Sequence, residues 1–223
     1  WFAVTIPLLR HYEQKYGVPK KKNAVKESFI RIWEVLGNVN KDKKMLYFLI
    51  AFFFYIDGVY TIIDLATSYG KDVGISDTHL LLAFLMTQIV AFPCALIFGK
   101  ISARMKSETL IQISILGYLG ISLFALQLDH AWEFWFLAVC VAVFQGSIQA
   151  LSRSYFAKII PKEKASEYFG FYDIFGKGAA FMGTMLIGIC TQLSGSSRTG
   201  VASLSFMFVI GFFFFRKTAS IEK

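Results

Sequence analysis

The chain has 223 residues and a formal net charge of +8; 56% of its residues are hydrophobic and only 17% are charged. Its mean hydropathy is +0.54, whereas soluble domains are about 45–50% apolar by a similar count. A soluble protein of this size would have too little polar surface to cover these side chains. The composition therefore argues against a soluble domain and predicts an all-α polytopic membrane protein, folded as one helical bundle.

The first nine residues, Trp1–Leu9, are mostly apolar, and no basic region precedes them, so they lack the layout of a signal peptide. We expect residues 1–9 to be the end of a preceding transmembrane helix. The chain would then be the C-terminal part of a longer protein.

Residues 10–44 differ from the rest because they carry ten lysines and arginines. We expect a basic cytoplasmic loop that contains an amphipathic helix over Asn23–Leu36. Two interpretations are open: the helix lies on the inner leaflet, attracted by anionic lipid, or it is a linker helix packed against the bundle. Five apolar side chains share one face of this helix at helical spacing: Val25, Phe29, Ile32, Trp33 and Leu36.

Six apolar runs follow, each close to the roughly 20 residues that a membrane-spanning helix needs. Short loops separate them, so consecutive helices are expected to run antiparallel. Together they predict a six-helix transmembrane bundle over residues 45–216, followed by a cytoplasmic tail at 217–223. The predicted spans are Met45–Thr67, His79–Phe98, Thr109–Leu126, Trp132–Leu151, Tyr168–Gln192 and Thr199–Phe215.

The distribution of basic residues supports six spans, because lysine and arginine collect in cytoplasmic loops. Twenty of the 23 lie in the segment 10–44, in the turns 100–106 and 153–164, and after residue 215. The opposite turns hold only Lys71 and Arg198, and Lys177 lies within a predicted span. Topology thus explains the positive charge, and we expect no nucleic-acid partner.

A short turn follows the second span, and its residues 99–106 read GKISARMK. This turn resembles the cytoplasmic motif G-x-L-A-D-R-x-G-R-K of the major facilitator superfamily. Ala103 stands where the family has an Asp that holds the outward-facing state, so that latch is not expected here. Gly99 and Arg104 match the motif, and the resemblance implies a gate or helix-interface role for them.

Six further segments are distinctive: QGSIQALSRSYF at 145–156, IPKEK at 160–164, EYFGFY at 167–172, FGK at 175–177, LSGSSR at 193–198 and DGV at 57–59. They resemble one branch of that superfamily, the vacuole-effluxer-like transporters related to the yeast vacuolar amino-acid effluxer of autophagy. The resemblance covers nearly the whole chain and implies the C-terminal half of a major facilitator fold, with a six-helix half preceding it. In this branch Asn is expected where Asp173 stands, and Asp64 looks peculiar to this chain.

Two acidic residues interrupt the first predicted span, where a charge costs at least roughly 2.5–3.5 kcal/mol on insertion scales. Asp57 is twelve residues past Met45, hence about 18 Å in and near the bilayer middle. We expect it to contact substrate or a coupling proton, because desolvation favours the protonated carboxyl group. The alternative is a hydrogen bond to a neighbouring helix. Asp64 lies closer to the outer interface, and we expect it at an interface or gate.

Asp173 and Lys177 lie one helical turn apart in the fifth predicted span, in the acid-first order that suits an intrahelical ion pair. Either the pair is static and lets the helix insert, or Lys177 leaves Asp173 to bind an anionic group such as a substrate carboxylate. The same span contains the small pairs Gly176/Ala180 and Ala179/Gly183, which let helix backbones approach closely.

Three residues of the fourth span complete the expected polar path. Gln145 and Gln149, one turn apart, offer amide groups to a polar solute or to a neighbouring helix. Arg153 follows near the inner interface, as a loop anchor or as a gate partner of Glu167 or Asp173.

These features predict a secondary transporter of small solutes, amino acids among them, that works by alternating access and is coupled to protons. The open alternatives are a membrane scaffold or receptor that moves nothing, and a lipid-handling carrier. We expect no catalysis and no cofactor, because the sequence holds no Ser-His-Asp or Cys-His arrangement, P-loop or HExxH motif. Cys94, Cys140 and Cys190 lack metal-ligand spacing, so no metal site is expected. The expected location is a prokaryotic plasma membrane, with a vacuolar membrane as the alternative.

Overall fold

The computed structural model describes residues 5–6 and 24–221. The predicted helix end at residues 1–9, the first part of the predicted basic loop and the last two residues of the tail therefore lie mostly outside the described residues. Throughout the described part of the chain the regular structure is helical, and six helices are long and apolar enough to cross a membrane. The predicted all-α polytopic bundle is confirmed.

Five of the six predicted spans lie within one long helix each, and the third, Thr109–Leu126, runs two residues past its helix into a short 3₁₀ turn. The largest difference is in the fourth span, where the helix continues eight residues past Leu151. The elements are α2 (Ala24–Lys41), α3 (Lys43–Asp72), α4 (Asp77–Ser102), α5 (Ser107–Phe124), η1 (Ala125–Gln127), α6 (Ala131–Ile159), η2 (Lys162–Lys164), α7 (Ala165–Ser194) and α8 (Ser197–Ser220).

Local interactions fix several helix ends. Asp42 caps α3, because its carboxylate accepts the backbone N–H groups of Lys44 and Met45 at 3.0 and 3.1 Å. Glu133 closes a capping box at the start of α6 by accepting the N–H of His130 at 2.9 Å. Gly195, at φ +69°, ends α7 in the left-handed conformation that glycine adopts without strain.

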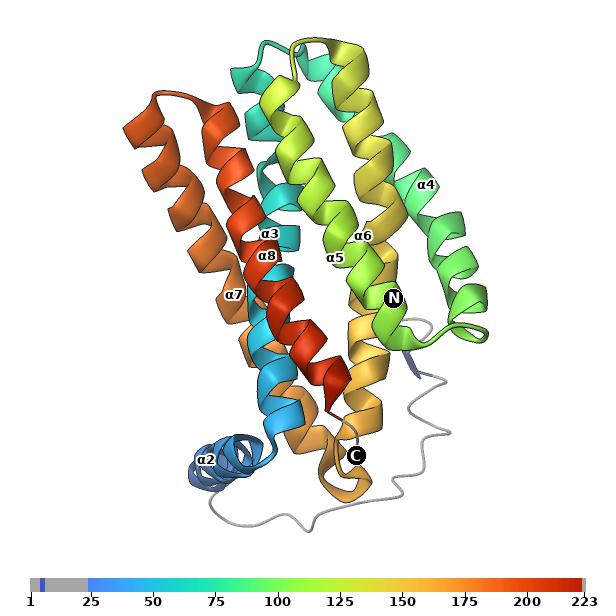
Figure 1. Cartoon of the computed structure of the whole chain (residues 1–223), viewed down its shortest axis with the longest axis vertical. Coiled ribbons are helices and arrows are strands. Elements are labelled where there is room, and N and C mark those ends of the chain that lie inside the picture. The colour runs from blue at the N-terminus through green and yellow to red at the C-terminus, as the bar shows by residue number, and fades with distance from the viewer. Residues whose placement is uncertain (1–4, 7–23, 222–223) are drawn as a thin grey trace.

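The six long helices run side by side along the long axis of the molecule (Figure 1). Helix α3 packs against α7 and α8, α4 packs against α6, and α5 lies between α6 and α8. The start of α5 lies beside the end of α6, where the Lys158 ammonium donates to Ser107 Oγ at 3.1 Å. The Lys217 ammonium lies 5.8 Å from the Tyr47 ring at the same end. We call this end, which also carries α2, the basic end of the bundle.

An aromatic cluster fills the bundle near its basic end. Seven rings from α3, α6, α7 and α8 meet there; they belong to Phe48, Phe52, Tyr55, Tyr155, Phe156, Tyr172 and Phe215. The Tyr55 hydroxyl lies 2.7 Å from Ser152 Oγ and ties α3 to α6. Because lipid gives helices no hydrophobic drive to associate, this packing and these hydrogen bonds hold the bundle together.

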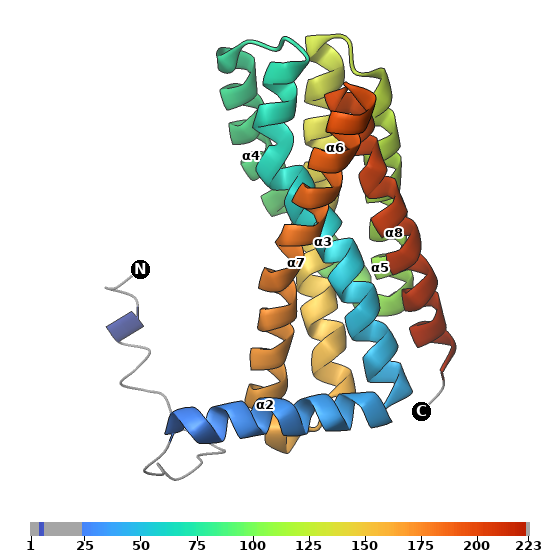
Figure 2. The same ribbon diagram turned by 90° about the vertical axis from the view of Figure 1, so that its left-hand side faces the viewer.

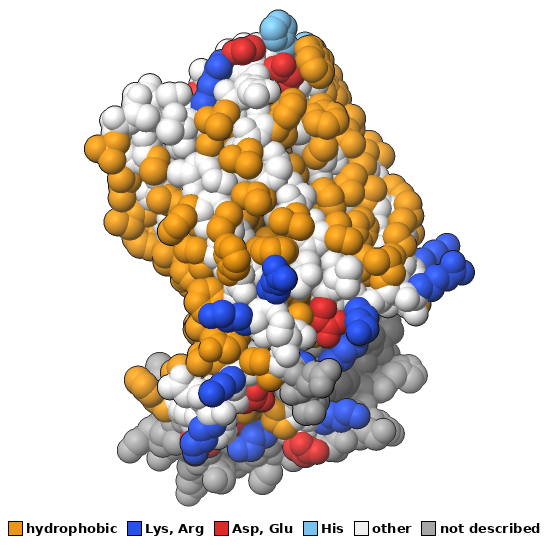
Figure 3. Space-filling model, in the orientation of Figure 1, with side chains coloured by type: hydrophobic (Ala, Val, Ile, Leu, Met, Phe, Trp, Pro, Cys, Tyr) orange, Lys and Arg blue, Asp and Glu red, His pale blue; other side chains and the backbone are white. Residues whose placement is uncertain are grey.

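Helices α4 and α7 are the least buried of the six within the described bundle. In the view of Figure 3, apolar side chains cover the middle of the molecule and charged side chains gather toward its two ends, as expected of a membrane-embedded protein. The exposed apolar residues of these two helices include Leu81, Leu85, Ile89, Phe92, Ile174, Phe181, Met185 and Leu193.

Helix α2 lies across the basic end, transverse to the other helices (Figure 2). It overlaps the predicted Asn23–Leu36 helix but continues to Lys41. Its buried stripe consists of Val35 and Val39, which are 2% and 3% exposed, with Ile32 and Leu36 packed beside them. Trp33, which was predicted to share the apolar face, is 72% exposed because it lies at the edge of that stripe. The contacts with α3 and α7 match the interpretation as a packed linker helix.

Candidate functional site

A crevice opens between α3, α6 and α7 and gathers four of the residues singled out in the sequence. These four are Gln149, Arg153, Asp173 and Lys177. The crevice has about 820 Å³ of empty volume, including space open to solvent. We call it the charged crevice; its other lining residues are Phe52, Ile56, Tyr60, Gly146, Ala150, Tyr172 and Gly176.

Contacts between α3 and α7 show how the two helices run beside each other and where along them the charged crevice lies. The rings of Phe52 and Tyr172 stack with their centroids 4.1 Å apart, and Asp57 meets Gly183 further along both helices. The two helices therefore run parallel, away from the basic end. Lys177 is twelve residues past Ala165, the first residue of α7, so it lies about 18 Å along that helix. Arg153 lies six residues, or about 9 Å, before the end of α6, so the charges of the crevice lie at different distances from the basic end.

An ion pair joins the walls of the charged crevice. Arg153 Nη1 of α6 lies 3.5 Å from Asp173 Oδ1 of α7, and the two side chains are 58% and 49% exposed. The Arg153 guanidinium also lies 5.1 Å from the Phe169 ring centroid, within reach of a cation–π interaction. An ion pair this exposed stabilises a protein by less than about 1 kcal/mol in water. The pair therefore contributes little to stability, but it links the α6 and α7 walls of the crevice.

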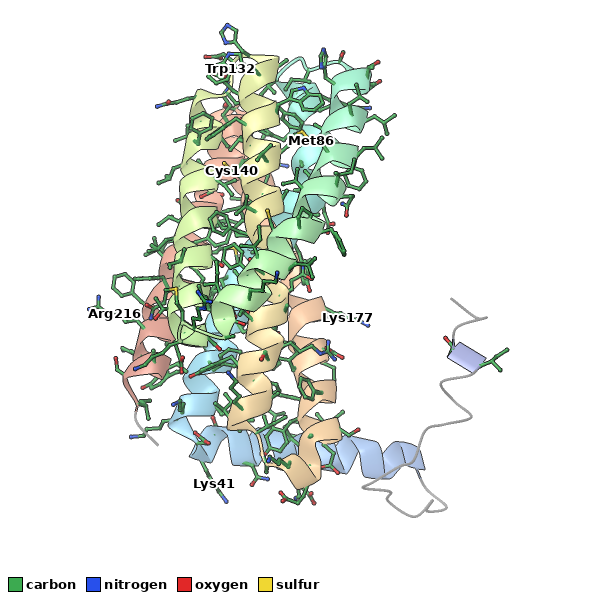
Figure 4. All side chains as sticks on the ribbon, turned by 90° about the vertical axis from the view of Figure 1, so that its right-hand side faces the viewer. Lys41, Met86, Trp132, Cys140, Lys177 and Arg216 are labelled. Carbon is green, nitrogen blue, oxygen red and sulfur yellow. The ribbon has the colours of Figure 1, made fainter. Side chains whose placement is uncertain are left out.

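The predicted pairing of Asp173 with Lys177 is wrong in this conformation. Asp173 pairs with Arg153, which is the alternative partner considered for that arginine. No ion pair or hydrogen bond joins the Lys177 ammonium to another residue in the described part of the chain. Figure 4 shows its side chain projecting from α7 away from the body of the bundle. The helical spacing was compatible with the intrahelical pair, but a residue on a third helix competes for the same carboxylate.

Gln145 and Gln149 divide between two crevices, although both lie on α6. Gln149 lines the charged crevice. Gln145 lines a second crevice of about 830 Å³, to which all six long helices contribute residues and whose walls are almost entirely apolar. Thr61, Thr87 and Gln88 supply most of the other polar groups of this apolar crevice.

Asp57 is fully buried at the interface between α3 and α7 and does not line the charged crevice. Its two carboxylate oxygens accept the backbone N–H of Gly183 at 3.0 and 2.9 Å. The hydroxyl of Thr61, one turn further along α3, donates to the same carboxylate at 3.3 Å. Asp57 therefore binds a neighbouring helix, which was the alternative to direct contact with a solute.

Gly183 makes this contact possible because it has no side chain. A Cβ atom at this position would lie 2.2 Å from Thr61 Oγ1 and 2.9 Å from Asp57 Oδ1, closer than real Cβ contacts. The small-residue spacing of α7 indicated a close helix approach there, but not that a carboxylate would meet the backbone. Thr61 gave no signal in the sequence, since threonines are common in membrane helices.

The remaining predicted residues lie away from the charged crevice. Asp64 is exposed on α3, two turns past Asp57. Gly99 is exposed at the end of α4, and its carbonyl accepts a hydrogen bond from the Ser102 hydroxyl at 2.7 Å. Arg104 is exposed in the turn between α4 and α5. Nothing in the described residues joins Asp64 or Arg104 to a partner by an ion pair, so their gating roles stay predictions.

The aromatic residues of the crevice were not predicted from the sequence. Phe52, Tyr60 and Tyr172 line it, but the chain contains 24 phenylalanines and 10 tyrosines, so composition could not single them out. Tyr60 carried one weak signal, because it lies three residues after Asp57 and four before Asp64 on one helix. Within residues 24–221, no group of three His, Cys, Asp or Glu side chains could hold a metal ion.

The comparisons with known proteins agree with this architecture. A family model described as vacuole effluxer Atg22 like matches residues 1–222. The chain is 45% identical over 211 residues to a protein of Bacillus subtilis (strain 168) named uncharacterized MFS-type transporter YxiO, covering 95% of this chain and 49% of that protein.

Fungal relatives are more distant. Autophagy-related protein 22 of Saccharomyces cerevisiae (strain ATCC 204508 / S288c) is 28% identical over 189 residues, which cover 79% of this chain and 36% of that protein. The Eremothecium gossypii protein of the same name is 30% identical over 194 residues, with 80% and 38% covered. The chain thus spans half or less of the length of these relatives. It belongs to the vacuole effluxer Atg22-like family and is an integral membrane protein.

Proposed function

We propose that the chain is the C-terminal six-helix half of a secondary transporter that moves small solutes, amino acids among them, by alternating access. The Bacillus relative is named as an MFS-type transporter and is about twice as long as the part it shares with this chain. A second six-helix half would face the sparsely buried helices α4 and α7. The solute would then bind between the halves, as in other transporters of this architecture.

The charged crevice is the observation that carries this proposal. Charged groups are costly in a bilayer and persist where they face water, each other or a ligand. Arg153, Asp173 and Lys177 line one hollow together with the amide of Gln149. A scaffold would have no need of such a hollow, and the uptake test below separates a transporter from a receptor that binds a solute without moving it. A lipid-handling carrier would use the apolar crevice instead, and it would transport lipid in the test below.

We further propose that protons drive the transport through Asp57. The Asp57 carboxylate accepts the Gly183 N–H through both oxygens, and a protonated carboxyl group accepts such a bond more weakly. Protonation would therefore loosen the contact between α3 and α7 and favour a change in their packing. The 45% identity with the Bacillus protein favours a bacterial plasma membrane as the location.

The experiment is a solute-uptake screen with the full-length protein in proteoliposomes. Radiolabelled amino acids, sugars, organic acids and fluorescent lipids are presented with and without an imposed pH gradient, and protein-free liposomes serve as the control. The proposal predicts uptake of at least one water-soluble solute that the gradient accelerates. A protein that folds and inserts but carries none of these solutes would contradict it. Uptake at the same rate with and without the pH gradient would contradict proton coupling but not transport.

A further inference from the structure

We propose that the charged crevice is a binding site for one singly charged anionic group, a carboxylate or a comparable oxyanion, and that Lys177 is its main ligand. This inference rests on the proposed transport function for its biological meaning. Its chemistry rests on the charges that line the crevice.

The charges of the crevice do not balance. Two cations, Arg153 and Lys177, and one anion, Asp173, line it, which leaves one positive charge. Asp173 is already engaged, because its carboxylate lies 3.5 Å from the Arg153 guanidinium. The described residues offer Lys177 no acid in ion-pair range. Lys177 is exposed on α7, and a cation on a membrane-spanning helix gains from an anionic partner.

Asp57, the next acid along the helices, does not pair with Lys177. Asp57 meets α7 at Gly183, six residues or about 9 Å past Lys177 along that helix. Its carboxylate is fully buried and occupied by the Gly183 N–H and the Thr61 hydroxyl. Asp64 lies still further from the basic end. The positive charge of Lys177 is therefore available to a solute.

The surroundings of Lys177 leave room for a bound group. Gly176 and Gly178 flank it without side chains, and the rings of Phe52, Tyr60 and Tyr172 form much of the nearby wall. The amide of Gln149 supplies a hydrogen-bond donor from the facing helix. Asp173 lies one helical turn from Lys177 and pairs with Arg153 in this structure. When the anionic group leaves, Lys177 can pair with Asp173, so binding and release would change the ion-pair partner of Asp173.

The test measures the local charge without any transport readout. In the full-length protein with its native cysteines replaced, Ala150→Cys places a thiol in the crevice, because Ala150 is exposed and lines it. Two thiol reagents of similar size are compared, the anionic 2-sulfonatoethyl and the cationic 2-(trimethylammonio)ethyl methanethiosulfonates. Adding Lys177→Met should lower the anionic-to-cationic ratio of labelling rates by about fivefold or more, because one unit charge has been removed nearby. Lys177→Arg should keep the ratio.

The control is Lys100→Met, which removes an exposed lysine at the end of α4 outside the crevice and should leave the ratio unchanged. An unchanged ratio in Lys177→Met would overturn the proposal. So would a preference for the cationic reagent in the background protein, because the other half would then supply an acid that neutralises Lys177. A positive result in a protein that carries no solute would contradict the transport proposal while leaving the anion site intact.

Discussion

The Asp57 carboxylate of α3 accepts the backbone N–H of Gly183 on α7 through both of its oxygens, at 3.0 and 2.9 Å. A side chain thereby binds the main chain of another helix in the middle of the apolar belt, where few polar partners exist. The contact fixes the approach of α7 to α3, and α7 carries two of the three charges of the charged crevice. The position of Lys177 and Asp173 therefore depends on a residue that does not itself line the crevice.

Gly183→Ala should weaken the packing of α7 on α3. The added methyl group would lie 2.2 Å from Thr61 Oγ1, and overpacking of this kind costs about 1–3 kcal/mol. Thermal unfolding of the purified full-length protein in detergent should show a lower midpoint. Gly188→Ala, on the same helix, is the control, because a Cβ there meets no atom within 4 Å. Equal midpoints for the two variants would contradict the close contact.

Asp57→Asn should separate the structural role of Asp57 from the proposed coupling role. Asparagine retains one oxygen that can accept the Gly183 N–H, so the protein should fold and reach the membrane in amounts close to wild type. It cannot take up a proton, so solute uptake should no longer respond to a pH gradient. Uptake in proteoliposomes at equal and unequal pH measures this. A gradient response as large as that of the wild type would exclude Asp57 as the coupling group.

The pair Arg153 and Asp173 should matter more for transport than for stability. The pair is half exposed, so breaking it by Arg153→Gln should change the free energy of unfolding by less than about 1 kcal/mol. Uptake should fall at least tenfold, because the walls of the crevice lose their ionic contact. The exchanged variant, Arg153→Asp with Asp173→Arg, should recover part of the loss. If each single variant transports like the wild type, the pair has no role in the crevice.

Two buried tyrosines should respond in opposite ways to loss of the hydroxyl group. The Tyr55 hydroxyl donates to Ser152 Oγ, which itself donates to the Ile148 carbonyl at 2.6 Å. Tyr55→Phe should therefore cost about 0.5–1.5 kcal/mol. Tyr118 is equally buried, but its hydroxyl has no partner among the described residues. Tyr118→Phe should be neutral or stabilising. Thermal unfolding midpoints of the two variants and the wild type measure this, and a lower midpoint for Tyr118→Phe than for Tyr55→Phe would contradict the hydrogen bonds described.

Sequence reasoning was sufficient for the helices and insufficient for their contacts. Long apolar runs and the asymmetry of lysine and arginine determine the number and order of the spans, because both follow directly from the bilayer. Which face of a helix meets which neighbour depends on tertiary packing. Asp57 and Lys177 are both single charges in apolar helices, yet one is sealed against α7 and the other is exposed. Likewise, spacing along α7 favoured Lys177 as the partner of Asp173, and only the position of α6 brings Arg153 within reach.

The central claim, that the charged crevice lies on the path of a transported solute, is tested most directly by one comparison of initial uptake rates. Full-length protein in proteoliposomes is compared with Lys177→Met and with the control Lys100→Met, at matched amounts of folded, inserted protein. We predict that Lys177→Met lowers the rate at least tenfold and that Lys100→Met changes it less than twofold. Equal rates for Lys177→Met and the wild type would contradict the claim.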